Sequence, residues 1–167
     1  IQTLNPTFIA ACTAGRSSSF GNKATPLTNK DLVGFTLNTR QRSPQLALEQ
    51  LIREGFTPVQ ALSAGASIFR GRTTTLSGDP RREEISVQRT IDYISKNLRR
   101  NLENTFTGEI ITANLVSDMK LQAEAFLTQN NHMITNISIT RIGVDTQEPR
   151  QINVVAQYTP LFPLNNL

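Results

Sequence analysis

The sequence has no tryptophan, a single cysteine (Cys12), a single histidine (His132), and only 6% aromatic residues. One cysteine excludes an internal disulfide, and the alanine-rich surroundings of Cys12 indicate a small buried side chain rather than a nucleophile. One histidine without a cysteine cluster excludes the usual zinc sites. No apolar run reaches the roughly 18–20 residues that a membrane-spanning helix needs, and no signal peptide is visible. These features are typical of a protein made in a reducing cytoplasm.

The chain has 167 residues, of which 38% are hydrophobic and 18% charged, which predicts one globular domain with its own core. Its formal net charge is +4, from 17 basic and 13 acidic side chains. This charge suits an anionic partner but does not require one. The chain begins with Ile rather than Met and stops at PLFPLNNL, so we expect it to be a piece of a longer protein.

The first half predicts short elements separated by loops. A helix is expected over residues 5–14, ended by Gly15, and a second after Ser43-Pro44, with Ser43 as N-cap, Pro44 at the first helical position, and Gly55 as its end. The remaining expectations are a loop over 16–31, a weak strand over 33–37, extended segments over 56–62 and 67–76 joined by Ser63-Ala64-Gly65, and a loop over 77–84.

Two long amphipathic helices follow. Residues 85–106 carry apolar side chains at spacings of three and four, which predicts a helix with one buried stripe. A second helix is predicted over 112–129, with Thr112 as N-cap. The expected apolar positions are Val87, Ile91, Ile94, Leu98, Leu102 and Phe106 in the first helix and Leu115 or Val116, Met119, Ala123, Phe126 and Leu127 in the second.

The last third changes to a period of two, which predicts a long β-hairpin of residues 134–145 paired with 150–159. Its expected apolar face is made by Ile137, Ile139, Ile152, Val154, Ala156 and Tyr158. The predicted fold class is therefore α+β, with a small, mainly antiparallel sheet that includes this hairpin and packs against the two helices.

A search for chemistry finds no catalytic pattern. Residues 15–25 miss the phosphate-binding loop, because five residues separate Gly15 from Gly21 and Ala24 replaces the hydroxyl residue. No G-x-S-x-G pattern accompanies His132, for which a helix C-terminal or a surface role is expected. We therefore expect no enzyme activity, no cofactor and no metal site.

One flank of the first long helix is basic and carries Arg89, Lys96, Arg99 and Arg100. Composition alone favours a solvated helix flank with weak pairs along the helix. A basic nucleic-acid-binding or adaptor domain is the alternative, although only Tyr93 is nearby and Asp92 and Glu103 interrupt the positive charge.

The order of several phrases resembles that of contractile tail sheath proteins, the outer sleeve of contractile phage tails, R-type bacteriocins and related injection systems. These phrases are PTFIAACTAG, ATPLTNKDLVGF, LEQLIREGFTPV, RGRTTT, ISVQRTIDYI, FTGE and QYTPLFPLNNL. The resemblance covers nearly the whole chain. It implies that residues 1–167 are the C-terminal core domain of such a protein, without the larger N-terminal part and the terminal strand.

The resemblance also implies a function. Subunits of such sheaths are joined by exchanged arms, so the hairpin would accept extended segments from neighbouring copies. Lys96, Arg99 and Arg100, with Arg89, would contact the tail tube or the next subunit. The implied partners are other copies, the tail tube protein, and baseplate and tail terminator proteins, without nucleic acid or a membrane span. The implied location is a virion tail or bacteriocin particle assembled in the host cytoplasm.

Overall fold

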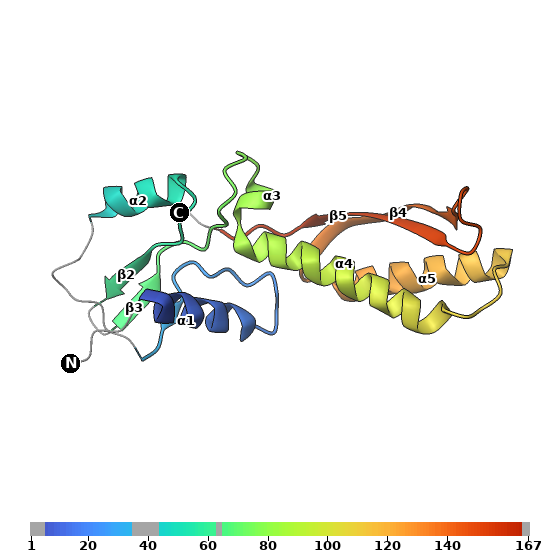
Figure 1. Cartoon of the computed structure of the whole chain (residues 1–167), viewed down its shortest axis with the longest axis horizontal. Coiled ribbons are helices and arrows are strands. Elements are labelled where there is room, and N and C mark those ends of the chain that lie inside the picture. The colour runs from blue at the N-terminus through green and yellow to red at the C-terminus, as the bar shows by residue number, and fades with distance from the viewer. Residues whose placement is uncertain (1–5, 35–43, 63–64, 165–167) are drawn as a thin grey trace. The chain divides into compact units, whose positions relative to one another are not determined.

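The computed structural model describes residues 6–34, 44–62 and 65–164. The chain forms two compact units, one running to Arg89 and resuming at Phe162, the other Thr90–Leu161. Helices and small antiparallel sheets alternate along it (Figure 1). The predicted α+β class is confirmed, and the single domain over residues 1–167 stays a prediction.

The first unit is built around a three-stranded antiparallel sheet with strand order β1-β3-β2. Leu27, Leu32, Ala66 and Ile68 are its buried core, and Ile9, Cys12, Phe20, Val59 and Ile85 pack against it. The elements of this unit that precede α4 are α1 (Pro6–Ser18), β1 (Asp31–Leu32), α2 (Gln45–Arg53), β2 (Val59–Leu62), β3 (Gly65–Ile68) and α3 (Pro80–Glu83).

The helix α1 does not end at Gly15, so that prediction is wrong. The backbone ladder continues past this residue, with the Ser19 N–H donating to the Gly15 carbonyl at 3.0 Å. A glycine inside a helix costs about 1 kcal/mol relative to alanine, and tertiary packing can offset that cost. Here Ile9 and Cys12 pack α1 onto the core, which keeps the helix intact to Ser18.

The strand predicted over 67–76 is also wrong beyond Ile68, where β3 ends. The threonine run that favours a strand is bonded otherwise: Thr73 donates its N–H to the Glu83 carbonyl at 2.7 Å and its hydroxyl to the Arg82 carbonyl at 2.6 Å. Those acceptors belong to α3, within residues predicted as a loop. The Asp79 side chain begins α3 by accepting the Arg81 N–H at 3.0 Å.

Two smaller predictions need correction. The strand expected over 33–37 lies instead at β1, with Val33 and Gly34 in a turn, and residues 35–37 fall outside the described residues. Pro44 is the N-cap of α2 rather than its first helical residue, and Ser43 lies outside the described residues.

The predicted end of α2 is confirmed at Gly55, which adopts a φ of 84°. The Gly55 N–H donates to the Ile52 carbonyl and the Phe56 N–H to the Leu51 carbonyl, at 3.0 and 2.9 Å. This pair of bonds is the Schellman motif, whose left-handed residue is usually glycine.

The second unit contains most of the first long helix, the second long helix and the hairpin. These elements are α4 (Ile85–Phe106), which enters this unit at Thr90, α5 (Ala113–Gln129), β4 (Ile134–Val144) and β5 (Ile152–Pro160). The bounds predicted for α4 are confirmed. The Thr112 hydroxyl accepts the Leu115 N–H at 3.2 Å, which confirms Thr112 as the N-cap of α5. Figure 1 shows the hairpin lying along both helices.

The apolar stripes predicted for the two helices form the core of this unit. Ile94, Ala123 and Leu127 are fully buried, and Leu98, Leu102 and Met119 are nearly so. Burying each large aliphatic side chain contributes roughly 1.5–3 kcal/mol. The helices are also joined by a hydrogen bond from Gln122 Nε2 to Asn101 Oδ1 at 3.0 Å. This core supplies the platform that carries the hairpin.

The packing at Gly71 generates a testable prediction. A Cβ atom at this residue would lie 2.7 Å from Cβ of the buried Leu27, whereas one at Gly15 would meet nothing within 4 Å. Gly71→Ala should therefore lower the free energy of unfolding by about 1–3 kcal/mol through overpacking. Gly15→Ala, the matched control in the same unit, should raise it by up to about 1 kcal/mol, because alanine favours the helix. Denaturant unfolding measures both, and an unchanged stability in Gly71→Ala would contradict this packing.

Candidate functional site

The β4–β5 hairpin brings all six predicted strand-accepting residues into one sheet. The two strands pair antiparallel, with Ile139 opposite Ala156, Ile142 opposite Val154 and Val144 opposite Ile152. Ile137, Ile139, Ile152, Val154, Ala156 and Tyr158 are all half-buried. The alternation of apolar and polar residues thus predicted the apolar face of the hairpin correctly.

Two β-bulges in β4, which regular alternation does not predict, keep that face apolar. The pairing shifts register between Thr135 and Ser138 and again between Ile139 and Arg141, and each shift adds one residue to β4. Asn136, within the first shift, has a φ of 51°. A bulge changes which face the following side chains occupy. The apolar residues of β4 therefore share a face at spacings of three, two, three and two: Ile134, Ile137, Ile139, Ile142 and Val144.

The spacing of these residues is the signal that could have revealed the bulges. A regular strand places alternate residues on one face, so an apolar step of three sends the next side chain to the opposite face. β4 contains two apolar steps of three residues, from Ile134 to Ile137 and from Ile139 to Ile142, and each indicates one inserted residue. Asn136 lies within the first of these steps. Asparagine tolerates the left-handed backbone better than most residues do.

β5 is regular and is fixed to α4 by Tyr158. The Tyr158 hydroxyl donates to the Ile91 carbonyl at 3.4 Å and lies 3.3 Å from Ser95 Oγ. Its ring sits on the half-buried face with Ala156 and Val154, whereas Gln157 and Val155 are exposed. The outer face of the hairpin is mostly polar, with Thr135, Ser138, Thr140, Arg141 and Gln157 exposed.

Among the described residues, β4 and β5 pair only with each other. The outer edge of each strand therefore has no strand partner within residues 6–34, 44–62 and 65–164. Unpaired strand edges present rows of N–H and C=O groups that can pair with another extended segment. The hairpin has the geometry of an acceptor for added strands.

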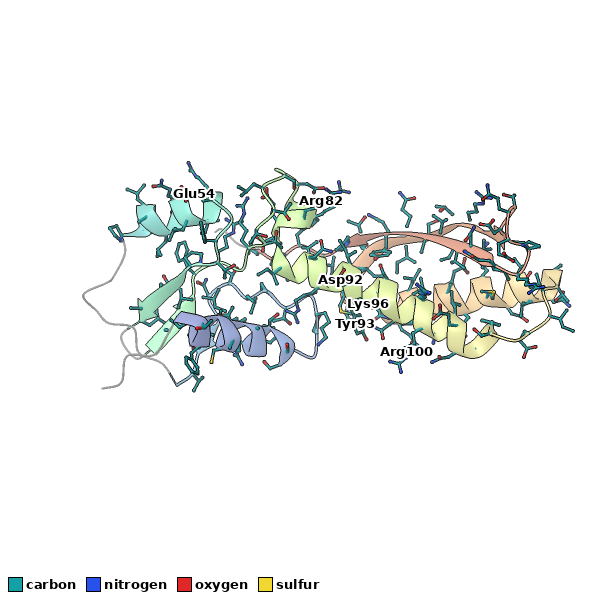
Figure 2. The ribbon with its side chains drawn as sticks, in the orientation of Figure 1. Glu54, Arg82, Asp92, Tyr93, Lys96 and Arg100 are labelled. Atoms are coloured by element: carbon teal, nitrogen blue, oxygen red, sulfur yellow. The ribbon has the colours of Figure 1, made fainter. Side chains whose placement is uncertain are left out.

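The basic residues of α4 divide into three kinds. Lys96 and Arg100 are exposed, one turn apart, and neither makes an ion pair with a described residue. Figure 2 shows Tyr93, Lys96 and Arg100 following one another along the helix. Arg99 is exposed but paired with Glu103, Nε to Oε1 at 2.7 Å, and this hydrogen bond raises the pKa of Arg99.

Arg89 is half-buried and differs from the other three. Its guanidinium carbon lies 5.7 Å from the centre of the Phe20 ring, and Arg16 lies over the same ring at 5.2 Å. Both terminal nitrogens of Arg89 are buried and have no hydrogen-bond partner among the residues that the structure describes. This burial lowers the pKa of Arg89. The exposed basic surface of α4 therefore consists of Lys96, Arg99 and Arg100. Arg89 packs instead against Phe20 in a loop, a contact that residue spacing along the helix could not predict.

The first unit contains an apolar cavity of about 530 Å³ between α1, β2 and the start of α4. It is lined by Ile9, Ala10, Thr13, Ala14, Ser17, Leu27, Thr57, Val59 and Ile85. None of these residues carries a charge or an imidazole. The described residues hold no cluster of three His, Cys, Asp or Glu side chains suited to a metal ion, and His132 is exposed. None of the described helices combines the length and apolar character needed to cross a bilayer.

Comparison with solved structures found the same fold in a contractile assembly. The chain superimposes on a chain of the cryo-EM structure of the anti-feeding prophage helical sheath in its contracted state, with a TM-score of 0.78 and 13% identity. It also matches a chain of the six-fold symmetrised anti-feeding prophage baseplate, with a TM-score of 0.75 and 15% identity. Both matches cover 99% of this chain.

The chain spans about half the length of the two matched chains, 49% of the baseplate chain and 50% of the sheath chain. No protein-family model matches the sequence, and comparison with curated proteins also found no match. The shared property is the fold.

The turn of the hairpin generates a prediction about acid. Asp145 Oδ1 accepts the N–H groups of Gln147 and Glu148 at 2.8 and 3.1 Å, and Oδ2 accepts from Asn153. These hydrogen bonds lower the pKa of Asp145 below its usual 3.8, and the bond from the Gln147 N–H has the largest effect. The charged carboxylate therefore supports the turn above pH 3.8, and this support is lost as the pH falls through the lowered pKa.

In an NMR titration, the amide protons of Gln147 and Glu148 should shift with a midpoint below 3.8. The matched control is Asp145→Asn, which keeps an acceptor oxygen but does not titrate, so this transition should disappear. A midpoint at or above 3.8 would show that the carboxylate does not hold the turn.

Proposed function

We propose that this chain is a structural subunit of a contractile injection system and that it belongs to the sheath. The observation that carries the proposal is the alignment of nearly all of the chain with a subunit of a contracted helical sheath, TM-score 0.78. The second match, to a baseplate chain, also comes from a contractile particle. The role is mechanical and involves no catalysed reaction and no bound cofactor.

The proposed mode of assembly is strand exchange through the hairpin. An extended segment from another copy adds to an outer edge of the β4–β5 sheet and pairs through its backbone. A strand that makes about five hydrogen bonds gains about 5 kcal/mol at about 1 kcal/mol each. Backbone links of this kind can persist while the connected bodies rotate. Because such contacts run head to tail without closing, repeated addition generates a helical tube.

The exposed basic surface of α4 is proposed to contact a central tube or the next copy. Lys96 and Arg100 are solvated and have no ion pair among the described residues, so they are available for acidic partners. Polar contacts suit a surface that must separate during contraction, because separation leaves no apolar patch in water. Arg89 takes no direct part in this contact, because its guanidinium is buried against Phe20.

Contraction is proposed to release energy stored in a metastable extended array. The subunits repack into a shorter arrangement with better contacts, and a trigger elsewhere in the particle starts the change. In this account the partners are other copies of the chain, a tail tube protein, and baseplate and tail terminator proteins. The protein would assemble in a bacterial cytoplasm and remain in the tail of a virion or bacteriocin particle.

The alternative, a nucleic-acid-binding or adaptor domain using α4, has weaker support. Arg89 is buried and Arg99 is paired with Glu103. Lys96 and Arg100 are therefore the two exposed cations of this helix that have no ion pair with a described residue. Binding to DNA whose affinity falls with salt by several charges would favour that alternative.

Electron microscopy tests the proposed role directly. The natural full-length protein that contains these residues should form striated sleeves when produced together with its tube protein. Without the tube protein, it should yield irregular or contracted assemblies. Particles that stay monomeric under both conditions would contradict a sheath function.

Charge reversal tests the proposed tube contact. Lys96→Glu combined with Arg100→Glu should reduce tube-templated assembly strongly, and the loss should be greater at low salt because screening is weaker there. Arg99→Glu, on the same surface but at a cation already paired with Glu103, should cause a smaller loss than the double variant. Counting sleeves per tube in micrographs measures both. Equal assembly by all variants would contradict the tube contact.

A further inference from the structure

The apolar cavity of the first unit is an open groove along one face of α1. Ala10 and Ala14 line it and are also exposed, so the groove can be reached from solvent. Its volume of about 530 Å³ lies in the range of pockets that enclose a small ligand, so it has room for a large side chain and the backbone beside it. The hydroxyl groups of Thr13 and Thr57 already donate to backbone carbonyl groups. The groove therefore favours an apolar occupant.

Three cations gather beside the end of the groove that lies at the C-terminus of α1. This basic cluster consists of Arg16, Lys23 and Arg89, and its members surround the Phe20 residue. The guanidinium carbons of Arg16 and Arg89 lie 5.2 and 5.7 Å from the centre of the Phe20 ring. Lys23 Nζ donates to the Phe20 carbonyl at 2.8 Å. Ser17 lines the groove and directly follows Arg16, so the groove reaches this cluster.

The basic cluster has no acidic partner among the described residues. None of Arg16, Lys23 and Arg89 takes part in the ion pairs that the described part of the chain forms. The terminal nitrogens of Arg89 are buried there without a hydrogen-bond partner. Burying an unpaired cation costs free energy, and a carboxylate brought beside it offsets that cost. The groove thus combines an apolar body with a positively charged end.

The loop between α4 and α5 carries the complementary side chains. Among the described residues, four large apolar side chains are more than three-quarters exposed: Val33, Leu46, Ile110 and Leu164. Of these four, Ile110 is the one directly adjacent to an acidic residue, Glu109. An apolar side chain that is 83% exposed gains free energy when a partner buries it.

The backbone of this loop, residues 107–112, holds the two side chains in place. We call this segment the tip. Gly108 adopts a left-handed φ of 97°, and the Glu109 N–H still donates to the last residue of α4 at 3.2 Å. The Thr112 side chain caps α5 at the other end of the tip. Glu109 and Ile110 are both exposed. A short loop fixed at both ends loses little conformational freedom when it binds.

The groove and the tip adjoin opposite ends of α4. Ile85, the first residue of this helix, lines the groove, whereas the tip follows its last residue, Phe106. The 22 residues of α4 span about 33 Å, so one chain cannot fill its own groove with its own tip. A contact between two different surfaces of identical copies runs head to tail and can repeat without closing.

We propose that the tip of one copy docks into the groove of a second copy, where Ile110 enters the apolar part and the Glu109 carboxylate pairs with Arg16. Arg16 is the exposed guanidinium of the basic cluster, and a guanidinium–carboxylate pair forms strong, directional hydrogen bonds. Lys23 and Arg89 add positive charge beside it. This inference rests on the proposed function, because the partner is another copy of the chain. It adds a contact that needs no exchanged strand.

Exchanging the two charges tests this contact in the full-length protein that contains these residues. Glu109→Arg and Arg16→Glu should each reduce the number of sleeves per tube by about tenfold or more, because each places like charges in contact. The double variant restores an opposite pair and should assemble within about twofold of the unmodified protein. Glu124→Arg is the matched control on α5, since it makes the same charge change at a side chain that is 45% exposed, and it should leave assembly unchanged.

The outcomes separate this contact from the proposed function. A double variant as impaired as the single variants, or single variants that assemble normally, would overturn the docking of the tip while the sheath function stands. If the unmodified protein forms no sleeves, the proposed function fails and this contact fails with it.

A cysteine pair tests the same contact without relying on the loss of assembly. In a Cys12→Ala background, Ala14→Cys combined with Ile110→Cys should form disulfides between copies when assembled sleeves are oxidised, because docking brings the two residues together. A ladder of covalent oligomers on a non-reducing gel is the expected result. Ala14→Cys with Leu121→Cys is the control, since Leu121 is 64% exposed but lies outside the tip. No ladder from the first pair, or equal ladders from both, would overturn the proposal.

Discussion

The proposed function depends on the requirement that backbone N–H and C=O groups find hydrogen-bond partners. Among the described residues, β4 and β5 satisfy only the groups that face each other. A two-stranded ribbon of this kind is marginally stable alone in water and gains stability from packing and from further strands. Here α4 and α5 supply the packing on one face. The outer edges have no strand partner among the described residues, and in the proposed function they are where other copies bind.

The core beneath the hairpin allows those edges to stay exposed without loss of the fold. Ile94, Ala123 and Leu127 are fully buried, so the helix pair does not depend on an added strand. Tyr158 then joins β5 to α4 through the Ile91 carbonyl. The bulges of β4 keep Ile134, Ile137, Ile139 and Ile142 on the packed face, and the same bulges interrupt its outer edge.

The sequence predicted best where a single periodic pattern dominates. The bounds of α4, the Thr112 cap and the two strands of the hairpin follow from spacing and capping chemistry, which act within a few residues. The failures involve distant partners. Thr73 has high strand propensity, but its hydrogen bonds go to Arg82 and Glu83. Gly15 remains helical because α1 packs on a distant core, and Arg89 leaves the basic surface because Phe20 lies beside it. No local pattern encodes these contacts.

The most direct test of the central claim is a cryo-EM map of the assembled particle that separates strands about 4.8 Å apart. The proposed function predicts a sheet of at least three strands at this site, in which an extended segment of a neighbouring copy pairs with an outer edge of the hairpin. A hairpin whose two outer edges face solvent, or are covered by its own chain, would contradict the account.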